Sequence, residues 1–242
     1  MSDTLEVCVD DHDDLATAIR LGVDRIELCS ALELGGLTPT TGLIDQARYS
    51  DVPIYAMIRP RAGNFIYSEA EVQRMEQDIE TVRIAGLAGV VFGALTPNLN
   101  LDFVILERLC RAARRMGLTL HRAVDDMTSP REAILPAIKL GFERILTSGG
   151  ADTALQGAIE LSAMTALAED KIEIMAGGGV SCNAIARLRA AKITSFHASC
   201  RGNRVVANRR PLELGILTKT LTEVRDGSRS EDKIFKAEGQ AT

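Results

Sequence analysis

The stretch Leu5-Glu6-Val7-Cys8-Val9-Asp10 decides the fold, because its pattern returns as Arg25-Ile26-Glu27-Leu28-Cys29-Ser30. Successive side chains of a strand point to opposite faces, so each Glu-x-Cys places a carboxylate and a thiol on one face and apolar residues on the other. A helix-like segment separates the two copies. They therefore predict neighbouring parallel strands whose polar faces share one interior.

Strand-like runs of the same kind continue along the chain and alternate with helix-like segments. The eight runs are Leu5 to Asp10, Arg25 to Ser30, Ile54 to Pro60, Gly89 to Leu95, Leu118 to Asp125, Arg144 to Ser148, Ile172 to Gly177 and Ser195 to Arg201. Eight such repeats predict an α/β fold, a single-domain (β/α)8 TIM barrel over residues 1–205. Residues 206–242 are expected to form a C-terminal helix and a polar, partly mobile tail, which we expect from Asp226 onward.

The alternative is a doubly wound sheet, whose first turn should read G-x-G-x-x-G, and Val9-Asp10-Asp11-His12 does not. A capping box, Ser68 with Glu71, predicts a helix that ends at Gly86. A second helix is expected from Leu101 to Met116. Glycines that precede strands are expected to end helices, and these are Gly22, Gly89, Gly117 and Gly141.

Composition narrows the class of protein. The 242 residues are 46% hydrophobic and 25% charged, enough to bury a full core, with a net charge of −5. An acidic chain without a basic, aromatic stripe argues against a nucleic-acid partner. The acidic first residues and the lack of a long apolar run predict a cytoplasmic protein without a membrane anchor, whose five cysteines stay reduced.

Polar residues gather where the expected strands end, which is the face that carries the active site in a TIM barrel. The candidates for acid–base catalysis are Glu6, Glu27, His121, Asp125 and His197. Lys171, at the start of a strand on the far face, is the lysine nearest to a strand interior. Schiff-base chemistry therefore lacks its nucleophile.

Glycine-rich strand ends and arginines predict an anion site. Exposed backbone amides and a helix start converge at such loops, and a guanidinium can grip a carboxylate or phosphate with two parallel hydrogen bonds. The candidate ligand-binding residues are Arg59, Arg61, Ser148, Gly149, Gly150, Gly177, Gly178, Gly179, Ser199 and Arg201.

Structural explanations compete with these roles. Cys8 and Cys29 could be small core residues, because buried free cysteines are common and inert. Glu6 with Arg59, or Glu27 with Arg61, could form ion pairs that only stabilise the barrel. His121 and His197 could be satisfied core histidines, and Met57 favours packing over metal binding.

The motifs together are similar to one known family. They are Leu5 to Asp10, Asp24 to Ser30, Gly35 to Pro39, Met57 to Arg61, Val91 to Leu95, His121 to Ala123, Leu146 to Gly150, Met175 to Gly179 and Phe196 to Ser199. In these motifs the chain resembles the CutC family of copper homeostasis proteins, and it departs from the family pattern at Ala62, Asn64 and Val124. The resemblance implies a cytoplasmic TIM barrel, a homodimer or higher homo-oligomer, associated with copper tolerance and with Cu(I) binding.

Two functions follow from these residues. Copper homeostasis is the leading one, with Cys8 and Cys29 as the metal ligands, because Cu(I) prefers thiolates, and with Met57 or His121 as a third donor. Arginines and glycine-rich loops have no use in a site built for Cu(I) alone. The alternative is therefore an acid–base enzyme of lyase or isomerase type that acts on an anionic, possibly phosphorylated, small metabolite.

Overall fold

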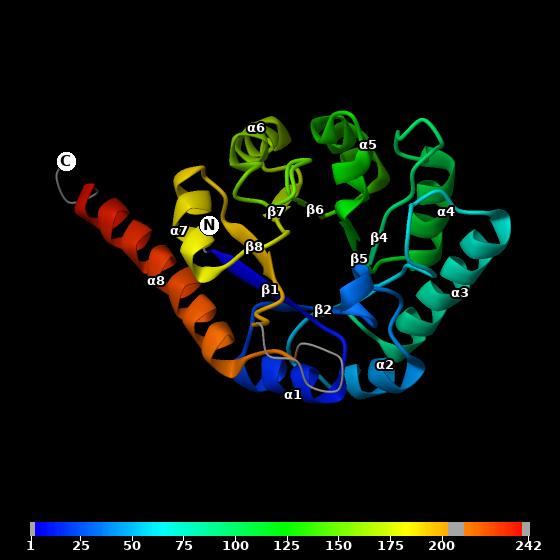
Figure 1. Cartoon of the computed structure of the whole chain (residues 1–242), viewed down its shortest axis with the longest axis horizontal. Coiled ribbons are helices and arrows are strands. Elements are labelled where there is room, and N and C mark those ends of the chain that lie inside the picture. Colours follow the sequence, from blue (N-terminus) through cyan, green and yellow to red (C-terminus); the bar gives the residue numbers. More distant parts are fainter. Residues whose placement is uncertain (1–2, 203–210, 239–242) are drawn as a thin grey trace.

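The computed structural model describes residues 3–202 and 211–238, with side chains described up to residue 226. Its centre is a closed barrel of parallel strands in the order β1 to β8, with β8 paired to β1 (Figure 1). The strands are β1 Thr4–Val9, β2 Arg25–Leu28, β3 Ile54–Met57, β4 Gly89–Phe92, β5 Gly117–Leu120, β6 Arg144–Thr147, β7 Glu173–Ala176 and β8 Ser195–Ala198. The predicted TIM barrel is confirmed.

Helices follow the strands and lie around the outside of the barrel (Figure 1). They are α1 His12–Leu21, α2 Thr41–Ala47, α3 Glu69–Ala85, α4 Phe103–Ala113, α5 Ile134–Leu140, α6 Ala158–Ala168, α7 Cys182–Ala190 and α8 Leu214–Glu238. Short 3-10 helices are η1 Leu32–Leu34, η2 Arg122–Asp126 and η3 Pro130–Ala133. In the part of the chain just defined, none of the helices is long and apolar enough to cross a membrane.

Local signals explain where several helices begin and end. The predicted capping box at the start of α3 is present, since the Ser68 hydroxyl accepts from the Glu71 amide and the Glu71 carboxylate accepts from the Ser68 amide. Gly22 and Gly141 end α1 and α5 in the left-handed conformation, as predicted.

Gly89 and Gly117 do not end helices, so that part of the prediction is wrong. They are the first residues of β4 and β5, and a Cβ at either position would collide with the ring of Tyr55. Their role is to leave room inside the barrel for a large aromatic side chain, which a pattern of glycines before strands does not reveal.

The strand expected from Leu118 to Asp125 is also shorter than predicted. β5 ends at Leu120, and the chain turns into η2 because the ring of His121 accepts a hydrogen bond from the Ala123 amide. Strand alternation therefore does not set the direction of Asp125.

The C-terminal segment adds α8 to the barrel, where it packs against α7 and β1 through the buried Leu217, Leu221 and Val224. The predicted mobile tail starts at Asp226. Beyond that residue the side chains lie outside the described part of the chain, and from 239 onward so does the backbone. Its mobility stays a prediction.

Candidate functional site

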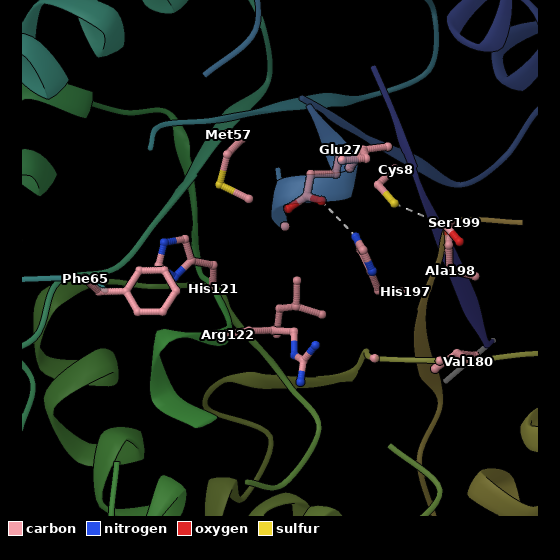
Figure 2. Close-up of a pocket in the computed structure, with 15 residues that line it drawn as sticks. Cys8, Glu27, Met57, Phe65, His121, Arg122, Val180, His197, Ala198 and Ser199 are labelled. Carbon is pink, nitrogen blue, oxygen red and sulfur yellow. Dashed lines mark hydrogen bonds and ion pairs between the residues drawn. The ribbon is translucent and has the colours of Figure 1, made fainter. Parts of the chain in front are cut away.

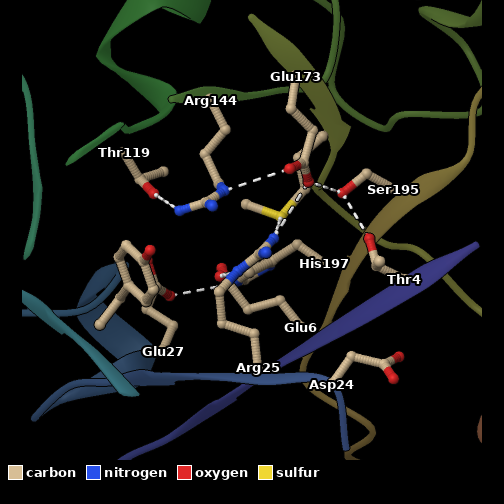
Figure 3. A network of polar contacts seen from close by, with 12 residues as sticks. Thr4, Glu6, Asp24, Arg25, Glu27, Thr119, Arg144, Glu173, Ser195 and His197 are labelled. Carbon is tan, nitrogen blue, oxygen red and sulfur yellow. Dashed lines mark hydrogen bonds and ion pairs between the residues drawn. The ribbon is translucent and has the colours of Figure 1, made fainter. Parts of the chain in front are cut away.

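The lower layer of the barrel interior is a network of charges that neutralise one another (Figure 3). Arg25 donates to Glu6 and, at 3.2 Å, to Glu173. Arg144 lies 3.5 Å from Glu173 and donates to the Thr119 hydroxyl at 3.1 Å. The register causes these contacts, because Glu6 is the partner of Arg25 in β1–β2 and Arg144 is the partner of Glu173 in β6–β7.

Electrostatics agree with this neutralisation. Burial alone would lower the pKa of Arg25, but Glu6 and Glu173 raise it overall. Burial alone would raise the pKa of Glu173, but Arg25, the Ser195 hydroxyl and Arg144 lower it overall. The Tyr55 ring closes the layer, with the guanidinium of Arg144 at 4.6 Å from its centroid. Glu6, a predicted catalytic residue, lies in this layer. From the sequence, Arg59 was considered as its ion-pair partner, but the structure pairs Glu6 with Arg25.

Above this layer, at the carboxyl ends of the strands, the barrel opens into a cavity of about 340 Å³, which we call the mouth cavity (Figure 2). Its polar lining comes from several strand ends and loops and includes Cys8, Glu27, His121, Arg122, His197 and Ser199. Its apolar walls include Leu32, Met57, Phe65 and Leu146. A volume of this size holds a small molecule between polar groups and apolar walls.

Three potential metal ligands meet at the base of the mouth cavity. Sγ of Cys8, a carboxylate oxygen of Glu27 and a ring nitrogen of His197 all lie within 4.8 Å of one another. Register explains the meeting, because Cys8 is the direct partner of Glu27, and His197 lies beside Glu6 on the other edge of β1. A thiol, an imidazole and a carboxylate are thereby placed in one cluster.

His197 and Glu27 form an ion pair in this cluster, with Nε2 of His197 2.9 Å from Oε2 of Glu27 (Figure 2). Burial alone would lower the pKa of His197, but Glu27 and Cys8 raise it well above its usual value. Burial alone would raise the pKa of Glu27, but His197 lowers it overall. The geometry therefore favours an imidazolium beside a carboxylate.

Cys29, the other predicted metal ligand, reaches the cluster through Glu27. Its Sγ lies 3.6 Å from the same Oε2 that pairs with His197, and it packs against Met57. Burial, and then the carboxylate of Glu27, raise the pKa of the Cys29 thiol well above its usual value. Glu27 thus lies in contact with both His197 and a thiol.

His121 lines another part of the mouth cavity and is fixed by its neighbours. Nδ1 accepts from the Ala123 amide at 3.2 Å, and the ring packs on Phe65 with centroids 4.8 Å apart. Burial and the charge of Arg59 lower the pKa of His121 to about 4. The ring is therefore neutral near pH 7, and its proton is on Nε2.

The Ser148-Gly149-Gly150 loop already holds an anion of the protein itself. The carboxylate of Asp125 accepts from the amides of Ser148 and Gly150 at 3.0 to 3.1 Å and from the hydroxyls of Thr147 and Ser148. Gly177 donates its amide to the carbonyl of Thr147. The structure thus brings the predicted Asp125, Ser148, Gly149 and Gly150 together, beside the mouth cavity rather than in its lining.

Gly178, Gly179 and Ser199 do line the mouth cavity, together with Arg122, which sequence reasoning quoted in a motif but did not propose as a ligand-binding residue. Arg122 donates to Asp125 at 2.8 Å and to the Ser148 hydroxyl at 3.0 Å, and its side chain remains 41% exposed. Its position directly after His121, near the end of the predicted strand Leu118 to Asp125, was the available signal.

The three arginines predicted to hold an anion are bound elsewhere in the protein. Arg59 donates to the carbonyls of Leu34, Gly36 and Gly63. Arg61 pairs with Glu71 and with the loop around Asn64. Arg201 pairs with Asp10 and Asp14, at 2.8 and 2.7 Å. The lining of the mouth cavity contains none of the three among the described residues, and their contacts support loops instead.

Comparison with known proteins identifies the family. The model of the CutC family matches residues 3–202. A CutC family protein of Sinorhizobium medicae is 49% identical over 213 residues, covering 87% of this chain and 86% of that protein. One from Caulobacter vibrioides is 45% identical over 227 residues, covering 93% and 92%. The chain belongs to the CutC family.

A solved structure agrees with this membership. The crystal structure of a Streptococcus agalactiae protein, provisionally named the copper homeostasis protein CutC, superposes with a TM-score of 0.78 at 30% identity. The match covers 81% of this chain and 98% of that one. The resemblance read from the sequence motifs is confirmed.

Proposed function

We propose that this CutC-family chain serves copper homeostasis by holding Cu(I) at the base of the mouth cavity. The observation that carries the proposal is the cluster in which Cys8 Sγ, the His197 ring and the Glu27 carboxylate lie within 4.8 Å of one another. Cys8 and Cys29 would supply the soft thiolates that Cu(I) prefers, and the His197 imidazole would supply a nitrogen.

The chemistry of the donor set fits this ion. A thiol or an imidazolium must lose a proton before it binds a metal, so binding of the cation releases protons from the cluster. Glu27 lies against both His197 and the Cys29 thiol, at 2.9 and 3.6 Å, and its negative charge favours a cation there. The apolar Met57 and Val91 pack against Cys29 and keep its surroundings dry.

An anaerobic competition assay with a chromogenic Cu(I) chelator tests the proposal. We expect Cys8→Ser and Cys29→Ser each to weaken Cu(I) binding by at least about 10-fold, the loss that even outer-shell changes produce at metal sites. Cys110→Ser, on α4 and outside the cluster, is the matched control and should bind like the wild type. Equal affinity in the wild type and in a Cys8→Ser, Cys29→Ser double variant would reject copper binding at this cluster.

A second function, acid–base catalysis on an anionic small metabolite, is favoured by the size and lining of the mouth cavity. A single ion needs only a small fraction of a cavity of about 340 Å³. Arg122 brings a positive charge to its wall, and Glu27 and His197 bring a proton-exchanging pair. The enzyme would be of lyase or isomerase type.

A thermal-shift screen with phosphorylated and carboxylated metabolites tests this second function. A ligand that binds only the native state raises the melting temperature by mass action. We expect at least one anion to do so for the wild type and for Arg131→Gln, and to fail for Arg122→Gln. Arg131 is a suitable control, because it is also half-exposed, at 49%, and pairs with Glu160 away from this cavity. If no anion shifts the wild type, the second function falls.

The remaining expectations are part of the same proposal. A cytoplasmic location, a homodimeric or larger assembly and the absence of a nucleic-acid partner stay predictions from the sequence. Glu27, His121 and His197 keep their proposed catalytic roles, since all three line the mouth cavity. Glu6 and Asp125 are proposed to support it from outside its lining.

A further inference from the structure

Two buried polar atoms of the mouth cavity have no partner within the protein. In the described part of the chain, neither Oε1 of Glu27 nor Nε2 of His121 makes a hydrogen bond, although both residues are only 3% exposed. Both residues line the mouth cavity (Figure 2). A buried polar group without a partner destabilises the folded protein, so a pair of them in one cavity points to a ligand that satisfies both.

The chemistry of the two atoms is opposite. Oε2 of Glu27 is held by His197, so Oε1 is a carboxylate oxygen that can accept a hydrogen bond or a proton. Nδ1 of His121 accepts from the Ala123 amide, so Nε2 of the neutral ring carries the proton and donates. A complementary ligand presents an acceptor to His121 and a proton to Glu27.

The donor is held in place before a ligand arrives. The His121 ring packs on Phe65, and a Cβ at Gly93 would lie 2.6 Å from Nδ1, so the residue facing the ring has to be glycine. Such fixed donors stabilise negative charge that develops on an oxygen, because they need no reorganisation during the reaction.

A third group on the cavity wall suits an anion. Arg122 lies against Gly178, where a Cβ would approach its guanidinium carbon to 3.1 Å, and Gly178 and Gly179 both adopt positive φ. The amides of this turn lead into α7, whose N-terminal cap, Ser181, makes no side-chain hydrogen bond to the helix. The positive end of the helix and the guanidinium favour a phosphate or carboxylate here.

We propose that the mouth cavity binds a small hydroxycarbonyl compound that carries one phosphate or carboxylate. Its carbonyl oxygen accepts from Nε2 of His121, the neighbouring carbon faces Oε1 of Glu27, and its anionic group lies at Arg122 and Gly178. This rests on the second proposed function and names its substrate class. Glu27 belongs to both this proposal and the metal cluster, but Arg122 lies outside that cluster, so an Arg122 variant tests the substrate class without changing the copper ligands.

The arrangement supports enolisation. Oε1 of Glu27 takes a proton from the carbon beside the carbonyl, the electrons of that C–H bond form a carbon–carbon double bond, and the carbonyl electrons move to the oxygen that His121 stabilises. Return of the proton to the same carbon restores the substrate. Delivery of the proton to the former carbonyl carbon instead, while the hydroxyl proton moves to the enolate oxygen, gives the isomer. Neither outcome needs an oxidant or a reductant.

The test compares carbonyl compounds with their reduced partners on the full chain. Three pairs are used: dihydroxyacetone phosphate with glycerol 3-phosphate, ribulose 5-phosphate with ribitol 5-phosphate, and hydroxypyruvate with glycerate. We expect at least one carbonyl compound to raise the melting temperature more than its reduced partner does, and to exchange its carbon-bound proton in D2O by NMR. Arg122→Gln should lose the shift from both members of that pair, whereas Arg131→Gln should keep it.

Two further variants separate recognition from proton transfer. Glu27→Gln should retain the melting shift and lose the proton exchange, and His121→Phe should lose the preference for the carbonyl member. Equal shifts from both members of every pair would overturn the substrate class but leave an anion-binding cavity. No shift from any probe would overturn the second function as well. The copper proposal is tested separately by Cu(I) affinity, which we expect to be unchanged in Arg122→Gln.

Discussion

The lower layer of the barrel and the mouth cavity are both built from buried charges, but only the lower layer pairs them almost completely. Below, Arg25 and Arg144 lie among Glu6, Glu173 and Thr119. In this layer Oε1 of Glu6 makes no hydrogen bond among the described residues, but it lies 3.8 Å from Nε2 of His197. Above, Oε1 of Glu27 and Nε2 of His121 lack hydrogen-bond partners among the described residues. The difference indicates that polar residues in one interior serve different purposes, with charges that stabilise the barrel below and groups available to a ligand above.

The largest effect that tests this comparison is on stability. Glu6→Gln should destabilise the protein by about 3 kcal/mol, because the buried guanidinium of Arg25 loses the fully buried one of its two carboxylates and keeps only Glu173, and an arginine cannot shed its charge. Glu27→Gln should cost about 1 kcal/mol, because His197 can become neutral when its partner is lost. Urea titrations of the two variants give both values.

The two variants are matched controls for each other, since each replaces a buried glutamate on a neighbouring strand by its amide. If Glu27→Gln were as destabilising as Glu6→Gln, the mouth would be a second structural ion-pair layer and the comparison would break down.

The next effect is the dependence of stability on pH. His121 has a folded-state pKa of about 4, lowered by burial and Arg59 from the ordinary value of 6.5. Between these two values the unfolded chain binds more protons, so the stability that neutral His121 provides is complete above pH 6.5 and is lost as the pH falls toward 4. The full loss is about 3 kcal/mol, of which only a part is reached at pH 5.

Urea midpoints measured between pH 7.5 and 5 should therefore fall less steeply for His121→Phe than for the wild type. His12→Phe is the control, because His12 is exposed on α1, and its profile should follow the wild type. A wild-type slope retained in His121→Phe would show that His121 is not the group that titrates.

The smallest effect separates backbone strain from function. Gly178→Ala and Gly141→Ala both place a side chain at positive φ, 94° and 84°, and each should cost about 1 kcal/mol. A Cβ at Gly178 meets Arg122, whereas one at Gly141 meets nothing within 4 Å. Only Gly178→Ala should therefore also reduce the melting shift from an anion, and equal ligand responses would remove Gly178 from the proposed anion site.

The sequence predicted the barrel and the main donors of the mouth because both follow from strand alternation. Glu27, His121 and His197 follow directly from the positions of their strands, and all three line the cavity. Alternation could not predict which arginine lines the cavity, because that depends on the contacts that each guanidinium makes with the loops. Arg59 is used by the carbonyls of Leu34 and Gly63, while Arg122 turns along the cavity wall.

Longer-range pairing was also invisible in the sequence. Arg144 meets Glu173 as its partner on the adjacent strand, but only closure of the barrel brings Arg25, which is far away in the chain, to the same carboxylate. The vacant space at Gly89 and Gly117 is explained only when Tyr55 is seen to fill it. Local patterns therefore predicted the elements, and the three-dimensional register decided the partners.

One measurement tests the central claim, that the base of the mouth cavity is the functional site, most directly. Crystals of the protein loaded anaerobically with Cu(I) should be measured on both sides of the copper absorption edge. The account predicts an anomalous difference peak beside Sγ of Cys8, within the cluster that includes His197 and Glu27. A peak at Cys110, Cys182 or the Asp10 and Asp14 carboxylates instead, with none in the mouth, would contradict it.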